Sequence, residues 1–386
     1  MFKQGEGRAD TRGSHDWTES LANSLPPIDA LLADTQEAGA SDLHLKSGIP
    51  PMIRVAGELV SLPESPLHEK DVEAYLAAII PDRLAADFLL NNEADFAYGL
   101  SDGSRFRVNA YRQRGCVSVA IRALRPPTGD FASLGLPPVL ARLAAEPRGL
   151  VLVTGPTGAG KSTTLAALID AINTTRRVNI ITVEDPIEIV HRDKMSMISQ
   201  REVGVDTGGF AEAMRRVLRQ DPDVILIGEM RDAETIDAAL KAAETGHLVL
   251  STLHTLDAAE TINRILEFFP ADHQNQVRLL LAASLRAIIS QRLIPTADGR
   301  RRVPAVEVLI NTERVADRIT DPTVTHEIPE IIAEGAYYGM ETFDQSILRL
   351  AGSGVITFDQ AMRNATSPAD LKLHAQQLGL LKTSAA

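Results

Sequence analysis

The feature that most constrains this chain is a glycine-rich octet, residues 155–162, that reads G-x-x-x-x-G-K-S. It follows the apolar run 149–154 and precedes a stretch, 161–173, whose apolar residues recur at helical spacing. Glycines let the backbone turn so that its N–H groups point at an anion, and a helix start adds partial positive charge. Because strand, loop and helix occur in this order, the octet predicts a phosphate-binding loop rather than an ordinary glycine-rich turn.

The octet also predicts how a nucleotide is held. Lys161 is expected to reach the β- and γ-phosphates, and the Ser162 hydroxyl to hold Mg²⁺. The predicted cofactors are therefore ATP and Mg²⁺. The predicted cofactor-binding residues are Gly155, Pro156, Thr157, Gly158, Ala159, Gly160, Lys161, Ser162 and Thr163.

Changes of pattern along the chain predict two domains. Residues 26–125 mix short alternating strands with two helices, which predicts an α+β unit with a small antiparallel sheet. The proline- and glycine-rich break that follows predicts a linker at 126–147. From 148 to 374, continuous apolar runs alternate with helices, which is typical of a parallel sheet covered on both faces, and residues 291–309 predict an edge hairpin. Residues 1–25 and 375–386 are expected to be tails.

Composition excludes several classes of protein. The formal net charge of −12 disfavours sequence-independent nucleic-acid binding, which needs cationic patches. The single cysteine, Cys116, excludes an internal disulfide and a four-cysteine zinc site. No apolar run is long enough to predict a membrane span, and the polar residues 1–24 do not resemble a signal peptide. We therefore expect any membrane association to go through a partner.

Three further strand ends carry residues suited to phosphoryl chemistry. Glu184 follows the run 178–183, Glu229 follows the run 224–227, and His254 follows the run 248–252. The carboxyl ends of parallel strands meet at one edge of a sheet, where ligands bind. A carboxylate there can position the attacking water, and it can also hold a Mg²⁺-bound water. Glu229 is the first candidate for the catalytic base, and Glu184 is its rival.

With these motifs in order, the chain resembles the secretion-type ATPase superfamily. The segments 40–45 and 339–345 narrow the resemblance to the PilT/PilU family of type IV pilus retraction ATPases, over about residues 26–374. The resemblance implies a PAS-like N-terminal domain, a RecA-like ATPase domain with C-terminal helices, and a homo-hexameric ring, alone or with a paralogous retraction ATPase. It also implies work at the cytoplasmic face of the inner membrane, on the platform protein of the pilus machine.

One segment departs from the family pattern. Residues 311–320 stand where PilT proteins carry a conserved arginine-containing motif, and with the run 326–332 they make the C-terminal third more similar to PilU. Two alternatives therefore stay open: an accessory or regulatory ring subunit that hydrolyses ATP weakly, and a pilus-extension or type II secretion ATPase. The single cysteine argues against the second, since those relatives usually carry a four-cysteine metal site.

The family resemblance further implies an arginine that reaches bound ATP from a neighbouring subunit. The N-terminal domain offers several arginines in or beside two predicted strands, and we expect Arg107 and Arg122 to be the pair that acts in trans. Because strand side chains alternate, Arg105 shares the face of Arg107.

Overall fold

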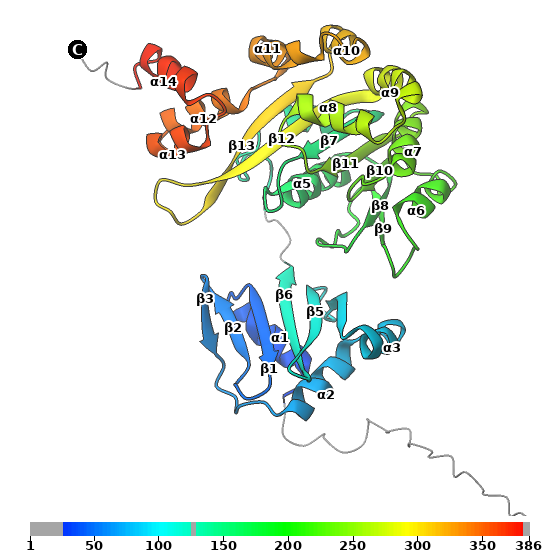
Figure 1. Ribbon diagram of the computed structural model, residues 1–386, viewed down its shortest axis with the longest axis vertical. Helices are drawn as coiled ribbons and strands as arrows, with labels where there is room; N and C mark the ends of the chain where they lie inside the picture. Colours follow the sequence, from blue (N-terminus) through cyan, green and yellow to red (C-terminus); the bar gives the residue numbers. More distant parts are fainter. Residues whose placement is uncertain (1–25, 125–128, 381–386) are drawn as a thin grey trace, which may run out of the picture. The chain divides into compact units, whose positions relative to one another are not determined.

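The computed structural model describes residues 26–124 and 129–380, and the chain divides into two compact units after Leu124 (Figure 1). The predicted tail 1–25, the first residues of the predicted linker and residues 381–386 lie outside the described residues.

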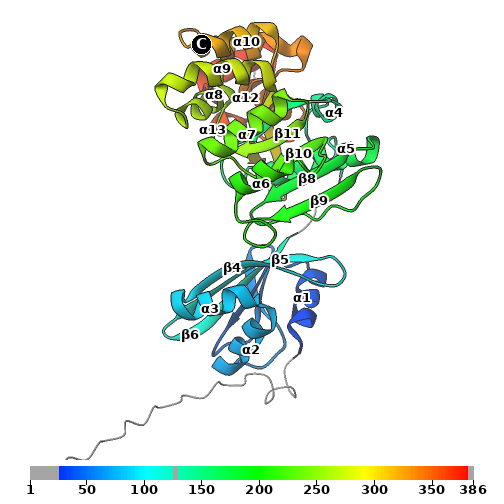
Figure 2. The same cartoon turned by 90° about the vertical axis from the view of Figure 1, so that its right-hand side faces the viewer.

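The first unit is a six-stranded antiparallel sheet in the order β3-β2-β1-β6-β5-β4, of which Figure 1 labels all but β4. Figure 2 labels the helices of this unit, α1, α2 and α3. Alternate residues of β5, namely Phe106, Val108 and Ala110, are fully buried among the apolar side chains of the helices. This alternation confirms the predicted α+β unit. Its elements are α1 (Ile28–Glu37), β1 (Asp42–Lys46), β2 (Met52–Val55), β3 (Glu58–Ser61), α2 (Glu69–Ile79), α3 (Asp82–Asn91), β4 (Glu93–Gly99), β5 (Arg105–Gln113) and β6 (Cys116–Leu124).

The second unit is built on a seven-stranded sheet in the order β13-β12-β7-β11-β10-β8-β9. All neighbouring strands run parallel except β12 and β13, which form the predicted hairpin. The parallel-rich sheet predicted from the continuous apolar runs is confirmed. Its strands are β7 (Gly149–Thr154), β8 (Asn179–Glu184), β9 (Met197–Glu202), β10 (Val224–Ile227), β11 (Leu248–Leu253), β12 (Leu285–Pro295) and β13 (Arg302–Ile310).

Helices cover both faces of this sheet, and each face has its own apolar core. One core includes residues of α4 and α5, and the other includes residues of α7, α8 and α9. The C-terminal helices pack beside the β12–β13 hairpin (Figure 1). The helices are α4 (Val139–Ala144), α5 (Lys161–Thr175), α6 (Phe210–Val217), α7 (Ala233–Glu244), α8 (Ala258–Glu267), α9 (Ala271–Ser284), α10 (Glu313–Thr320), α11 (Ile328–Glu334), α12 (Phe343–Gly352), α13 (Phe358–Asn364) and α14 (Pro368–Gln377), with short 3₁₀ turns at Thr325–Glu327 and Gly335–Tyr338.

Two expected boundaries differ from the structure. Much of the expected linker belongs to the second unit, because Leu136, Leu140 and Leu143 are buried in its core. The expected C-terminal tail begins inside α14, where Ala375 is fully buried. In both places apolar side chains pack against a core that is distant in sequence, which local composition does not reveal.

Candidate functional site

The predicted phosphate loop follows β7, a strand buried along its whole length between β12 and β11. Gly155 has a φ of 139°, and a β-carbon there would lie 2.4 Å from the carbonyl oxygen of Gln291. Gly160, the residue directly before α5, has a φ of 90° in the left-handed region. Side chains at these positions would clash or strain the backbone, so the glycines are what allow the loop to close over the start of α5.

Gln291 of β12 braces the loop, a role that no pattern in the sequence indicates. Its amide nitrogen donates to the carbonyl oxygen of Ala159 at 2.6 Å, and its amide oxygen accepts from the Thr164 hydroxyl at 2.8 Å. The side chain is 1% exposed. A buried amide with both ends bonded fixes the loop to the neighbouring strand, since breaking either bond leaves a buried polar group unpaired.

Lys161 and Ser162 lie where the sequence analysis placed them, in the first turn of α5. The Lys161 ammonium donates to the carbonyl oxygen of Gly155 at 2.7 Å and of Pro156 at 3.2 Å, so it lies over the glycine-rich backbone. Burial lowers the pKa of Lys161, and the carboxylates of Glu229 and Glu188 partly offset that effect. Ser162 is exposed at the helix start. The loop can therefore present a cation, a hydroxyl and backbone N–H groups to a phosphate chain.

Glu229 lies at the carboxyl end of β10 and is the centre of a charged cluster. Its side chain is 13% exposed and pairs with Arg231 at 2.7 Å and with the Nε2 atom of His254 at 3.6 Å. Gly228 brings this strand end close to β8, because a β-carbon on Gly228 would lie 3.4 Å from the Cα atom of Glu184. The structure thus brings together Glu229, His254 and the end of β8, and Glu229 is close enough to Lys161 to influence its pKa.

Glu184, the rival base, is held by its own neighbours. Its Oε1 atom accepts from the Thr182 hydroxyl at 2.6 Å and from the Gln200 amide at 3.0 Å. Gln200 lies in β9, a strand that the sequence analysis missed. Both carboxylates lie at the carboxyl ends of neighbouring strands, β8 and β10, so the geometry does not decide between them as the base.

His254 follows β11 with 53% of its side chain exposed. It lines a cavity of about 770 Å³ together with Arg231 and residues of α8. The other histidine of this region, His247, lies at the opposite end of β11, where its ring contacts the carbonyl oxygen of Ala242 at 3.0 Å. Only His254 is therefore placed to act at the phosphate loop.

The donor set fits Mg²⁺ that arrives with a nucleotide. Among residues 26–124 and 129–380, no group of three or more His, Cys, Asp or Glu side chains could hold a metal ion. Mg²⁺ in phosphoryl-transfer sites keeps waters and substrate phosphates as ligands and takes only one or two protein groups. The exposed Ser162 hydroxyl can be such a group, and contact of Glu184 and Glu229 with the ion through water stays a prediction.

Arg107 and Arg122 lie in the first unit, directly opposite each other on β5 and β6. Both are exposed, on the sheet face opposite the apolar core. Arg122 pairs with Asp42 of β1 at 2.9 Å. The two guanidinium groups can therefore form one cationic patch on a sheet face, and their action on ATP stays a prediction.

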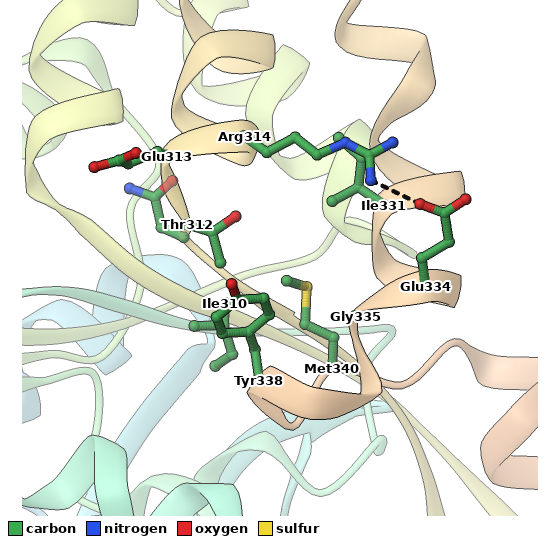
Figure 3. A pocket seen from close by; sticks show the side chains of 10 residues that line it. Ile310, Thr312, Glu313, Arg314, Ile331, Glu334, Gly335, Tyr338 and Met340 are labelled. Carbon is green, nitrogen blue, oxygen red and sulfur yellow. Dashed lines mark hydrogen bonds and ion pairs between the residues drawn. The ribbon is translucent and has the colours of Figure 1, made fainter.

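The segment that departs from the family pattern is folded. It forms α10, which Thr312 caps and which buries Val315 and Ile319. Its start lines a pocket of about 670 Å³ between α10, α11 and the turn Gly335–Tyr338 (Figure 3). Arg314 pairs with Glu334 at 2.6 Å beside this pocket.

Comparison with known proteins decides the family. The model of the family described as "Type II/IV secretion system protein" matches residues 22–337. The chain belongs to this family. It is 46% identical to the Type IV pilus retractation ATPase PilT of Pseudomonas aeruginosa, over 88% of this chain and 98% of that protein. It is 41% identical to the Type IV pilus ATPase PilU of the same organism, over 90% of each chain.

Solved structures agree with this assignment. A crystal structure of the pilus retraction motor PilT with bound ADP superposes with a TM-score of 0.83 at 41% identity, covering 90% of this chain and all of that one. The ATPase DotB of Legionella pneumophila superposes with a TM-score of 0.73 at 28% identity, covering 89% of this chain and 96% of that one. The predicted PilT/PilU family, ATPase class and nucleotide binding are confirmed. The expectation that the C-terminal third is closer to PilU stays a prediction.

No helix within the described ranges combines the length and apolar character that a bilayer crossing requires.

Proposed function

We propose that this chain is a motor that hydrolyses ATP to drive the retraction of type IV pili, working as a homo-hexameric ring. The observation that carries the proposal is the meeting of Lys161, Glu229 and His254 at one sheet edge, in a chain 46% identical to a retraction ATPase over 88% of its length. The ring acts at the cytoplasmic face of the inner membrane on the platform protein of the pilus machine, alone or with a paralogous ATPase.

In the proposed mechanism, each residue has a role that its position supports. Lys161 contacts the β- and γ-phosphates, and the Ser162 hydroxyl would hold Mg²⁺, which would supply positive charge beside the phosphates. Glu229 orients the attacking water and accepts its proton, since it is mostly buried and close enough to Lys161 to influence its pKa. His254 contacts Glu229 and responds to the state of the γ-phosphate. Arg107 and Arg122 of a neighbouring subunit add permanent positive charge to the transition state.

The test combines a biochemical and a cellular measurement. We expect the purified wild-type protein to hydrolyse ATP, and a strain that lacks the chain to extend labelled pili without retracting them. Complementation with wild-type protein should restore retraction, and complementation with Lys161→Ala should not. Normal retraction in the deletion strain would overturn the proposed function.

The two alternatives give different outcomes in the same experiments. A regulatory ring subunit would bind ATP but hydrolyse it feebly, and retraction would then depend on a paralogue. The altered segment 311–320 is the observation that favours this candidate. An extension ATPase would leave the deletion strain without surface pili.

A further inference from the structure

Glu307 is a buried carboxyl group that the proposed mechanism does not use. It lies in β13 between Val306 and Val308, and only 8% of its surface is exposed. Burial raises the pKa of Glu307 to about 7, with Asp257 and Asp344 adding to the increase. Burying a carboxyl group costs free energy unless it is hydrogen-bonded, so its partners indicate what the group does in the fold.

The partner of Glu307 is the first residue of α8. The backbone N–H of Ala258 donates to the Oε1 atom of Glu307 at 2.9 Å. Ala258 is itself fully buried, so water cannot replace this acceptor. An acceptor here also meets the positive end of the α8 dipole.

Ala258 follows directly after the loop that begins with His254. Within this loop, the Thr255 hydroxyl contacts the Thr261 hydroxyl at 2.6 Å, and the N–H of Leu256 donates to Glu260 at 2.7 Å. These contacts tie the loop to its own helix, α8. The Glu307 contact instead ties the loop and the helix start to another strand, and so fixes them relative to the sheet.

The same carboxyl group faces the C-terminal helices. Arg292 of β12 lowers the pKa of Glu307 by its charge, although burial dominates. Arg292 also lies 3.9 Å from the centre of the Phe343 ring in α12 and donates to the carbonyl oxygen of Asn364 in α13 at 3.2 Å. The charged groups facing Glu307 are thus Asp257 from the start of α8, Arg292 from β12 and Asp344 from α12. Arg292 and Glu307 lie on the same face of the hairpin, since Glu307 is opposite Ser290 and Arg292 is two residues further along β12. Arg292 contacts α12 and α13, its charge acts on Glu307, and Glu307 in turn accepts from the start of α8.

We propose that Glu307 is a positioning residue that holds the His254 loop against the sheet and couples it to the C-terminal helices. The proposal rests on the proposed role of His254 in ATP hydrolysis. A displaced His254 loop changes the geometry around Glu229 while leaving the phosphate loop, braced separately by Gln291, intact. The predicted signature is therefore a loss of turnover without a loss of nucleotide affinity.

The test compares Glu307→Ala with Glu307→Gln in the full-length protein. Alanine removes the acceptor, and we expect kcat for ATP to fall about tenfold, since small displacements of catalytic groups have effects of this size. The affinity for ADP should stay within about twofold. Glutamine keeps an acceptor oxygen for the Ala258 N–H, and should restore kcat to within about twofold of wild type. Glu341→Gln is the matched control, because Glu341 contacts Arg349 of α12 rather than α8.

A second variant removes the donor of the same hydrogen bond instead of the acceptor. Ala258→Pro removes the N–H donor, and proline is well tolerated at the first position of a helix. Asp257 before it is extended, with φ −146° and ψ 174°, which is compatible with a following proline. We expect Ala258→Pro to lower kcat as Glu307→Ala does, and the double variant to be no worse than either single variant.

The outcomes separate this inference from the proposed function. Wild-type kcat in both Glu307→Ala and Ala258→Pro would overturn the positioning role. A loss of ADP affinity as large as the loss of kcat in the two Glu307 variants would also overturn it. If Glu307→Ala does not fold, the two single variants Glu307→Gln and Ala258→Pro test the positioning role. Glu307→Gln should keep the wild-type kcat, and Ala258→Pro should lower it. Absence of ATP hydrolysis by the wild-type protein would instead refute the proposed function.

Discussion

Replacing Glu307 with glutamine is expected to change how the stability of this protein depends on pH. Glu307 is almost fully buried, and its pKa in the folded protein is about 7 against an ordinary value of 4.5. Below about pH 4.5 the group is protonated in both the folded and the unfolded chain. Between the two pKa values the folded chain keeps a proton that the unfolded chain has lost, so rising pH lowers the free energy of unfolding. Above about pH 7 the carboxyl group is ionised in both states, and the free energy of unfolding falls no further through this group.

The size of the effect follows from the two pKa values. Each unit of pKa difference corresponds to about 1.4 kcal/mol, so ionised Glu307 lowers the free energy of unfolding by about 3 kcal/mol relative to a neutral side chain. About 1 kcal/mol of this loss is present at about pH 5.5 and the whole at about pH 8. Glutamine does not titrate and still accepts from the Ala258 N–H. The stability of Glu307→Gln relative to wild type should therefore rise by about 2 kcal/mol between these pH values.

Urea denaturation followed by circular dichroism, at one protein concentration and several pH values, measures this difference. All other titrating groups are shared by the two proteins and cancel in the comparison. A stability difference that stays constant within about 0.5 kcal/mol would refute the reasoning, because it would mean that Glu307 ionises at an ordinary pKa. If the stability of Glu307→Gln relative to wild type fell with rising pH, the pKa of Glu307 would be lowered on folding, which contradicts the reasoning.

Four further outcomes are expected. Lys161→Ala should abolish ATP hydrolysis in a phosphate-release assay, and wild-type turnover would show that the nucleotide site is misassigned. Glu229→Gln should bind nucleotide but turn over about 10²-fold more slowly, and a normal Glu229→Gln beside an inactive Glu184→Gln would reverse their roles. Gln291→Leu should weaken ADP binding about tenfold in calorimetry, because the Ala159 carbonyl of the phosphate loop and the Thr164 hydroxyl of α5 lose their buried partner. Mixed rings of Arg107→Ala and Lys161→Ala should regain part of the ATPase activity, and inactive rings with proven subunit exchange would exclude action in trans.

The sequence predicted those elements whose cause is local. The strands β7, β10 and β11 are continuous apolar runs because helices cover them on both faces, and such runs are visible in the sequence. The helices α12 and α13 begin at two Thr-x-x-Gln capping boxes, which are also local patterns. β9 was missed because it is an edge strand whose residues are mostly polar, with only one of them buried. The region of α4 was assigned to a linker because prolines precede this short helix and are typical of linkers. The apolar face that the helix buries is too short to outweigh them.

In the candidate site, too, some residues could be predicted from local patterns and others could not. The phosphate loop, Glu184, Glu229 and His254 could be predicted because each follows a recognisable strand, and parallel strands bring their carboxyl ends together. The residues that hold these groups in position are separated from them in sequence. Gln291 lies 132 residues after Ala159, and Glu307 lies 49 residues after Ala258. No spacing rule connects such pairs, since the contact exists only after β12 has joined β7.

The hairpin β12–β13 explains why both supporting residues come from one element. Glu307 is directly opposite Ser290 in the antiparallel register, so Gln291, the next residue, points to the other face of the sheet. Gln291 accordingly reaches the phosphate loop and α5, and Glu307 reaches the His254 loop and α8 on the opposite face. The hairpin also carries the C-terminal helices, through the Ser346 hydroxyl that accepts from the Val306 N–H at 3.2 Å and through Arg292 on Phe343. A shift of these helices would act on the hairpin, and through it on both loops of the nucleotide site. This arrangement gives α12 and α13 a physical route to the rate of ATP hydrolysis.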